Sequence, residues 1–236
     1  MNLSYRLRTV ASLVPEGSCI ADIGTDHGYI PIYLAKEGII KKALAMDVRK
    51  GPLKRAEEHI REYGLEDIIE IRLSDGMKEL KAGEADTVVI AGMGGELIIR
   101  ILTEGRHMWP FVKKWILSPQ SDIYKVRAFL RENGFLTEKE TMVMEEGKYY
   151  TIMAVEAWDE RSAQKEGKEV YDYYGEYLIH TGNPVLAGYL EREKEQKEVL
   201  LNSLGADGTM TEKAAARKKE LEQELNWIKE AQDEMQ

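Results

Sequence analysis

The amino-acid sequence predicts an α/β protein in which a doubly wound, mostly parallel sheet precedes a C-terminal antiparallel helical hairpin. Short apolar runs alternate with helix-compatible segments in the earlier part of the chain. Several of these runs end in an acidic residue or a glycine, as strands that border a ligand site do. After residue 158 the sequence becomes charged and helix-prone. We therefore expect one domain at residues 1–158 and a second at residues 159–236.

The first predicted strand leads into a D-x-G-x-D-x-G motif at residues 22–28. A strand ending near Asp22 brings this carboxylate to the edge of the sheet where open α/β proteins bind ligands, and Gly24 lets the backbone pass close beneath the ligand. The motif has neither the P-loop spacing nor the G-x-G-x-x-G of dinucleotide-binding proteins. Asp22 and Asp26 beside a helix N-terminus suit a ligand with an ammonium group, such as S-adenosylmethionine (SAM). The alternative is an ordinary turn in an unrelated α/β protein.

Three further apolar runs repeat this pattern after a helix predicted at about residues 30–36. The run at residues 42–47 ends in Asp47, where an acid can accept hydrogen bonds from a ribose diol. Another ends in Asp75, suited to accepting from an adenine amine, and the next ends in glycines around Met93. Each acid alone is more often a solvated turn or a helix cap. Acids at three successive strand ends form one constellation and favour a nucleoside cofactor site.

The remaining elements of the first domain follow the same alternation. A helix is predicted from Ile123 to Asn133, and Gly134 ends it. The last strands are expected to include an antiparallel hairpin around residues 145–148. The apolar runs predict strands at residues 114–117, 135–136 and 150–155.

The second domain is predicted to contain two long helices. Asn183 and Pro184 interrupt the charged segment, residues 204–208 form a turn, and Thr211 caps the second helix. Apolar residues recur at helical spacing, at Leu186 and Leu190 before the turn and at Leu221, Leu225 and Ile228 after it. Two helices joined by a short glycine turn should pack antiparallel, like a coiled coil.

These motifs together resemble class I SAM-dependent methyltransferases. The resemblance is closer to the bacterial tRNA adenine-N1 methyltransferases of the TrmK family, which modify the adenosine at tRNA position 22 in the D-arm. It covers nearly the whole chain and rests on residues 3–7, 21–31, 45–48, 51–53, 74–77, 90–95 and 117–120. One departure is Ser118-Pro119-Gln120, which stands where the family pattern has Gln-Pro-Asn.

The resemblance implies a Rossmann-like class I methyltransferase sheet, SAM as cofactor, tRNA as partner and no metal. The implied cofactor-binding residues are Arg6, Asp22, Gly24, Thr25, Gly28, Tyr29, Asp47, Val48, Ser74, Asp75, Gly76, Ala91, Gly92 and Gly94. The implied substrate-binding residues are Gly95, Pro119, Gln120 and Lys218. Arg6, on an N-terminal helix over the site, is expected to bind either the SAM carboxylate or an RNA phosphate.

Adenine N1 already carries a lone pair, so its methylation needs positioning more than a strong base. We assign Asp26, His27 and Met93 as catalytic residues. Asp26 is expected to hydrogen-bond the adenine amine or stabilise developing positive charge, and Met93 to pack on a ring. His27 is expected to stack or accept a proton, the alternative being an ordinary helix-start residue.

Charge and composition limit the function. The 236-residue chain has a formal net charge of −9. Residues 159–236 hold 11 Lys and Arg against 18 Asp and Glu, a net charge of −7, so residues 1–158 are nearly balanced. The single cysteine, Cys19, excludes a disulfide framework and a multi-cysteine metal site. The sequence shows no signal region and no membrane-length apolar run, so we expect a soluble, cytoplasmic protein.

Three function classes remain open at this stage. The first is a tRNA methyltransferase whose helical hairpin grips tRNA, with residues 217–219 as its best basic contact. The second is a SAM-dependent enzyme of the same fold that acts on another RNA, a protein or a small molecule. The third is a non-catalytic SAM-binding module associated with RNA. The hairpin can alternatively serve dimerisation, so the protein is expected to be a monomer or a homodimer.

Overall fold

The computed structural model describes residues 2–156, 159, 163–164, 166–204 and 211–236. The chain divides into two compact units, Met1–Glu166 and Gly167–Gln236. The predicted domain boundary at residue 158 and residues 205–208 of the predicted turn lie outside the described residues. Within the described part, no helix is both long and apolar enough to span a bilayer.

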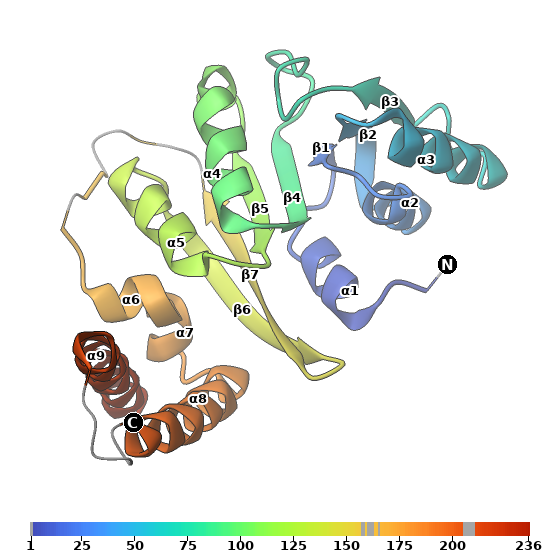
Figure 1. The fold of residues 1–236 in the computed structure, drawn as a ribbon. Coiled ribbons are helices and arrows are strands. Elements are labelled where there is room, and N and C mark those ends of the chain that lie inside the picture. Colours follow the sequence, from blue (N-terminus) through green and yellow to red (C-terminus); the bar gives the residue numbers. More distant parts are fainter. Residues whose placement is uncertain (1, 157–158, 160–162, 165, 205–210) are drawn as a thin grey trace. The chain divides into compact units, whose positions relative to one another are not determined.

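The first unit contains a seven-stranded sheet with the order β3-β2-β1-β4-β5-β7-β6 (Figure 1). The strands from β1 to β5 pair in parallel, and β7 pairs antiparallel with both β5 and β6. The strand bounds are β1 Ser18–Ile23, β2 Ile40–Asp47, β3 Ile69–Leu73, β4 Thr87–Met93, β5 Lys114–Pro119, β6 Thr137–Glu145 and β7 Lys148–Glu156. This sheet confirms the predicted fold class and the predicted antiparallel hairpin.

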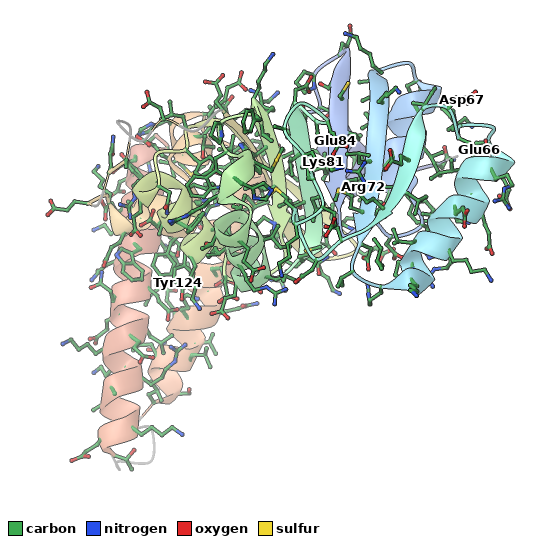
Figure 2. The ribbon with its side chains drawn as sticks, turned by 90° about the horizontal axis from the view of Figure 1, so that it is seen from above. Glu66, Asp67, Arg72, Lys81, Glu84 and Tyr124 are labelled. Atoms are coloured by element: carbon green, nitrogen blue, oxygen red, sulfur yellow. The ribbon has the colours of Figure 1, made fainter. Side chains whose placement is uncertain are left out.

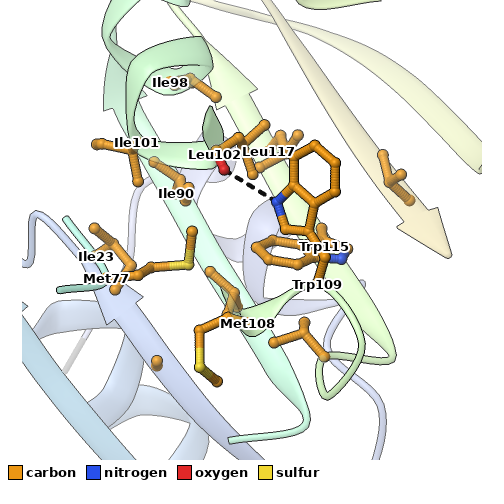
Figure 3. Close-up of a cluster of buried hydrophobic side chains, with 14 of the residues drawn as sticks. Ile23, Met77, Ile90, Ile98, Ile101, Leu102, Met108, Trp109, Trp115 and Leu117 are labelled. Carbon is orange, nitrogen blue, oxygen red and sulfur yellow. Dashed lines mark hydrogen bonds between the residues drawn. The ribbon is translucent and has the colours of Figure 1, made fainter. Parts of the chain in front are cut away.

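Two hydrophobic cores cover the two faces of the sheet because successive strand residues point to opposite faces. In β5, Trp115 and Leu117 belong to one core and Ile116 to the other. The first core packs β4 and β5 against α4 (Gly95–Glu104), the 3₁₀ helix η1 (Arg106–Met108) and α5 (Ile123–Glu132). Figure 3 shows this core, in which the Trp109 indole N–H donates to the Leu102 carbonyl at 3.0 Å. The second core involves α1 (Tyr5–Ala11), α2 (Tyr29–Lys36) and α3 (Lys50–Glu62).

Residues 135–136 do not belong to a strand, contrary to the prediction from their apolar character. The Phe135 amide donates to the Leu130 carbonyl at 2.9 Å, so this residue continues the C-terminal cap of α5. Gly134 has φ of +80°, which is the left-handed conformation that commonly ends a helix. The Phe135 ring is buried edge-on to Trp109 and Trp115, and β6 begins only at Thr137.

The second unit contains four helices among its described residues: α6 (Glu169–Tyr174), α7 (Glu176–His180), α8 (Pro184–Ser203) and α9 (Glu212–Glu234). The predicted Thr211 cap is confirmed, since its side chain accepts from the Ala214 amide. The interruption at Asn183 and Pro184 is the start of α8, where the Asn183 side chain accepts from the amides of Val185 and Leu186. Two contacts show that helices α8 and α9 run antiparallel. The Gln232 side chain donates to Glu191, and Lys197 forms an ion pair with Glu224. The two short helices were not expected from the sequence. Both contact α9, so Leu221 and Ile228 are buried within a larger helical unit than a simple hairpin.

Candidate cofactor site

A cavity of about 630 Å³ opens at the carboxyl ends of the central parallel strands. It lies where the strand order reverses between β1 and β4, which is the usual ligand position in open α/β sheets. Its volume is within the range of small-molecule and cofactor sites. The lining residues are Arg6, Leu7, Asp22, Gly24, Thr25, Asp26, Tyr29, Ile30, Asp47, Val48, Arg49, Ala91, Gly92, Met93, Leu97 and Gln120.

Gly24 shapes the floor of this cavity. Its φ is +77°, and a Cβ atom at this position would lie 1.9 Å from the Met93 Cε atom. The amides of Gly24 and Thr25 both donate to the Met46 carbonyl, at 2.7 and 2.9 Å. These two hydrogen bonds hold the loop after β1 against the end of β2. The terminal methyl group of Met93 occupies the position that a Cβ atom on residue 24 would take.

Two buried carboxyl groups, Asp22 and Asp47, border the cavity at the ends of β1 and β2. Burial raises the pKa of Asp22 to about 6; the neighbouring Asp47 charge adds to this rise and the Thr25 hydroxyl opposes it. The Asp47 Oδ1 atom accepts from the backbone N–H of Arg49 at 2.7 Å, which fixes the carboxylate. A cationic ligand group would relieve the repulsion between these two acids.

Arg6 places a positively charged side chain in the lining of the same cavity. Its backbone N–H donates to Glu145 Oε1 at 3.2 Å, and its guanidinium lies 5.1 Å from the centre of the Tyr150 ring. The Arg6 Nη1 atom is buried and has no hydrogen-bond partner within the described part of the chain. Gly92, with φ of +85°, leaves space beside it, since a Cβ there would lie 4.0 Å from Nη1. A buried donor without a partner points to an anionic or carbonyl group of a ligand.

Asp26 and His27 form a polar and aromatic cluster next to the cavity. Arg55 donates to Asp26 Oδ1 at 3.3 Å and to His27 Nε2 at 3.1 Å, so the bonded His27 nitrogen acts as an acceptor. The His27 ring stacks on Tyr29 at a centroid distance of 5.1 Å and on His59 at 5.3 Å. Asp26 lines the cavity, whereas His27 does not. His27 has φ of +59°, a conformation unusual for a non-glycine residue and held here by these contacts.

The loop after β3 carries Ser74, Asp75 and Gly76, none of which lines the cavity in this structure. Ser74 Oγ donates to the Gly76 carbonyl at 2.8 Å and accepts from the Glu79 amide at 3.2 Å. Asp75 is partly exposed and pairs with Lys78 at 2.5 Å and Arg100 at 3.5 Å. The Lys78 hydrogen bond lowers the pKa of Asp75. The predicted contact of this loop with the cofactor stays a prediction.

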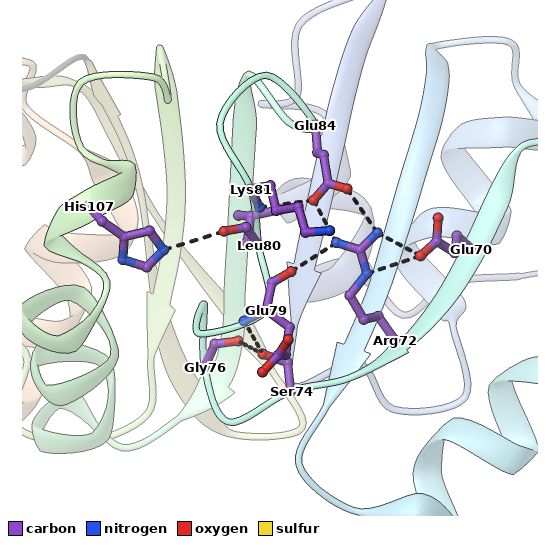
Figure 4. Close-up of polar contacts among 9 residues, drawn as sticks. All are labelled: Glu70, Arg72, Ser74, Gly76, Glu79, Leu80, Lys81, Glu84 and His107. Atoms are coloured by element: carbon purple, nitrogen blue, oxygen red, sulfur yellow. Dashed lines mark hydrogen bonds and ion pairs between the residues drawn. The ribbon is translucent and has the colours of Figure 1, made fainter.

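Arg72 fastens the same loop to the edge of the sheet (Figure 4). Its guanidinium donates to Glu84 at 2.5 Å, to Glu70 at 2.6 Å and to the Glu79 carbonyl at 3.0 Å. Figure 2 shows Arg72, Lys81 and Glu84 close together beside β3. Because this clamp fixes residues on both sides of the loop, it limits the positions that Ser74 to Gly76 can adopt.

Of the four predicted substrate-binding residues, only Gln120 is among the described residues that line the cavity. Its backbone N–H donates to the Met93 carbonyl at 2.8 Å. Pro119 ends β5 and pairs in register with Met93. A Cβ on Gly95 would lie 2.5 Å from the Ser121 carbonyl oxygen, so that glycine permits close packing of two loops. Lys218 lies on α9, is exposed, and pairs with Glu222 at 3.9 Å.

Gly28 and Gly94 also have local packing roles. A Cβ on Gly28, which has φ of +68°, would lie 3.3 Å from Ile32 Cδ1, and one on Gly94 would lie 3.0 Å from Ser121 Oγ. Neither residue lines the cavity. Four lining residues were not predicted from the sequence, namely Leu7, Ile30, Arg49 and Leu97. Leu7, Ile30 and Arg49 each directly follow a predicted residue, and this adjacency was the available signal for them.

Comparisons with known proteins agree with this geometry. The methyltransferase domain family matches residues 3–153. The tRNA (adenine(22)-N(1))-methyltransferase of Bacillus subtilis is 32% identical over 235 residues, covering 99% of this chain and 98% of that protein. The crystal structure of the B. subtilis m1A22 tRNA methyltransferase TrmK is similar with a TM-score of 0.85 and 31% identity over 98% of each chain. The structure of M. capricolum TrmK with S-adenosyl-homocysteine has a TM-score of 0.83 and 26% identity over 99% of each chain.

Proposed function

We propose that this chain, which belongs to the family of tRNA (adenine(22)-N1)-methyltransferases, transfers a methyl group from SAM to N1 of the adenine at tRNA position 22. The observation that carries the proposal is the cavity at the sheet edge, which Asp22, Asp47 and Arg6 line together. The buried Arg6 Nη1 atom has no hydrogen-bond partner among the described residues. This set combines buried carboxylates with a guanidinium. SAM carries an ammonium, a carboxylate and a ribose diol, and each finds a complementary group there.

The residues present fit SAM in a specific arrangement. Asp47 is the last residue of β2, where an acid accepts hydrogen bonds from ribose hydroxyls. Asp22 is suited to the ammonium group, because a cation would stabilise its ionised form against the effect of burial. Arg6 Nη1 is suited to the carboxylate. Exposed Val48 supplies an apolar surface for the adenine of the cofactor.

SAM supplies an electrophilic methyl group on a sulfonium. The methyl carbon bonds to adenine N1 while its bond to sulfur breaks, and the adenine becomes cationic until it loses a proton. Asp26 is exposed at the cavity rim, where its carboxylate can accept from the adenine amine and stabilise this positive charge. Met93 packs against the target ring, and the His27–Tyr29–His59 stack orients the loop that carries Asp26. Catalysis then rests mainly on positioning.

The helical unit is the part of the chain that we assign to tRNA, with Lys218 among its contacts and dimerisation as the competing use. The partner follows from the family, and we place the reaction in the cytoplasm for the same reason. Two alternatives remain distinct from this proposal. An enzyme of the same fold acting on another RNA or a small molecule would have the same cavity, and a non-catalytic SAM-binding module would bind SAM without turnover.

The test uses an unmodified tRNA transcript with adenine at position 22, a matched transcript with guanine there, SAM and the full chain. Mass analysis of the digested nucleosides should detect N1-methyladenosine only with the first transcript. Methylation of both transcripts, or of another nucleoside, would favour the alternative enzyme. SAM binding by calorimetry with no methylated product would favour the non-catalytic module.

A further inference from the structure

The helical unit carries a partly exposed aromatic pair beside its buried core. Tyr173 on α6 and Trp227 on α9 stack with a centroid distance of 4.2 Å and an interplanar angle of 25°. Tyr173 is 37% exposed. The packing of these helices is already provided by buried residues, Val170 and Tyr174 from α6 and Leu221 and Ile228 from α9.

A cavity of about 570 Å³ lies against this aromatic pair, wholly within the helical unit. The two rings form part of its wall. One face of α9 supplies the rest, through Ala216, Lys219, Glu220, Gln223 and Glu224. The site therefore offers an aromatic surface, an amide that can both donate and accept, and a nearby ammonium group.

The charges around the cavity leave Lys219 available for an anion. Glu224 pairs with Lys197 at 3.0 Å and with Arg217 at 3.2 Å, and Glu220 pairs with Arg217 at 2.9 Å. Lys197 also pairs with Glu193 at 2.7 Å, so Lys197 and Arg217 together face three carboxylates and both cations are taken up by this network. Lys219 is exposed and takes part in no ion pair among the residues that the structure describes.

We propose that the Tyr173–Trp227 cavity binds one unstacked base of the RNA substrate, with Lys219 on an adjacent phosphate. The proposal rests on the proposed function for the class of ligand. Aromatic side chains next to a cation are the usual elements of sites for unpaired nucleotides, because every base has a face that can stack. A second copy of this chain fits less well, since charged residues are depleted in the cores of protein interfaces and here they surround two rings.

The experiment measures affinity of the full chain for the unmodified tRNA transcript at several salt concentrations. Trp227→Leu and Tyr173→Leu should each weaken binding by about tenfold to a hundredfold. The factor should be the same at every salt concentration, because a stacked base releases no counterions. Trp227→Phe is the matched control and should retain most of the affinity. Lys219→Gln should instead make the salt dependence shallower.

Two further measurements separate the outcomes. SAM affinity by calorimetry should be unchanged in every variant, since the cofactor cavity lies in the other unit. Unchanged RNA affinity in both leucine variants would overturn the inference while methylation by the parent chain still supports the proposed function. A leucine variant that shifts a dimer to a monomer in sedimentation, with unchanged RNA affinity, would likewise overturn it and assign the surface to a second copy.

Discussion

Asp47 is the residue whose removal tests the cofactor site most directly. Its carboxylate is buried at the end of β2 and already fixed by the Arg49 amide, so no reorganisation is needed to receive a ribose. Asp47→Ala should weaken SAM binding by about tenfold to a hundredfold, the worth of a charge-assisted hydrogen bond, as measured by calorimetry. Asp67→Ala, an exposed acid before β3, is the control and should bind normally (Figure 2). If Asp47→Ala bound SAM as tightly as Asp67→Ala, Asp47 would not be a cofactor-binding residue.

Asp22 should show that the cofactor site costs stability. Its pKa is about 6 in the folded protein against an ordinary 3.8, because burial penalises the charge. The stability associated with this raised pKa is fully present below pH 3.8 and is lost as pH rises through about 6. Asp22→Asn cannot ionise, so above that window it should be more stable than the parent, by at most about 3 kcal/mol.

Denaturant unfolding at several pH values measures this difference without ligand. The advantage of Asp22→Asn should grow as pH rises from 3.8 through about 6, the two pKa values of Asp22 in the unfolded and folded chain. SAM binding by the same variant should weaken, because the amide cannot balance an ammonium charge. A stability difference that does not change with pH would mean that Asp22 ionises in the folded protein as readily as in the unfolded chain.

At the scale of elements, a buried ion pair joins α5 to the β6–β7 hairpin. Arg127 Nε and Nη2 donate to Glu140 Oε1 at 2.9 and 2.7 Å, and both side chains are at least nine-tenths buried. Glu140→Leu should lower the free energy of unfolding by about 3–5 kcal/mol, because the buried guanidinium loses the carboxylate that balances its charge.

The double variant Arg127→Met with Glu140→Leu is the control for this prediction. Removing both charges together should restore most of the lost stability, since paired charges can often be replaced by apolar residues of similar volume. Denaturant unfolding of the single and double variants measures the coupling between them. A double variant as unstable as Glu140→Leu would show that the shape of the pair, rather than its charge, holds the hairpin.

The elements that could be predicted from the sequence are those with a local cause. The strands that end in Asp22 and Asp47 are apolar runs followed by acids, and both features depend only on neighbouring residues. Helices α6 and α7 span 6 and 5 residues, too short for a helical period to emerge, and they form because α9 covers them. Strand β6 begins only at Thr137 because Phe135 is held in the C-terminal cap of α5. The apolar character of residues 135–136 does not reveal this cap.

The same distinction applies to the site. Asp22, Gly24 and Asp47 were predictable because strand ends bring them to one edge. Leu97 lines the cavity because of the direction of α4. Gly95 packs against the loop after β5, where a Cβ would lie 2.5 Å from the Ser121 carbonyl oxygen, and its predicted contact with substrate stays a prediction. Arg6 was expected only from the family resemblance, since its pairing with Glu145 joins residues 139 positions apart. Tertiary packing decides these cases, and a single sequence does not encode it locally.

At the scale of the whole molecule, the two units differ in charge and in the residues that they supply. The second unit, Gly167–Gln236, holds 9 Lys and Arg against 15 Asp and Glu, a net charge of −6, yet its exposed basic residues include Lys218 and Lys219 on α9. Among the described residues, those that line the cofactor cavity extend no further than Gln120. Cofactor binding and the proposed RNA contacts of the helical unit are therefore separable by cutting the chain.

The position of the cut follows from contacts after β7. The Asp159 amide donates to the Gly134 carbonyl at 3.1 Å, and Arg131 exchanges hydrogen bonds with the Gln164 backbone at 2.7 and 3.0 Å. These residues pack on the C-terminal end of α5 and belong to the first unit. A chain that ends after Glu166 keeps them, so it is the appropriate truncated protein.

This truncated chain should stay folded and bind SAM within a few fold of the intact protein, because it retains the whole sheet and every lining residue of the cavity. Its affinity for the tRNA transcript should fall, and the dependence of that affinity on salt should become shallower, since fewer phosphates are neutralised. Methylation at low transcript concentration should fall in proportion to the lost binding. Calorimetry, salt-dependent binding and methylation assays on both chains measure these changes. Full methylation by the truncated chain would show that the helical unit is not needed for tRNA, and would leave dimerisation as its better explanation.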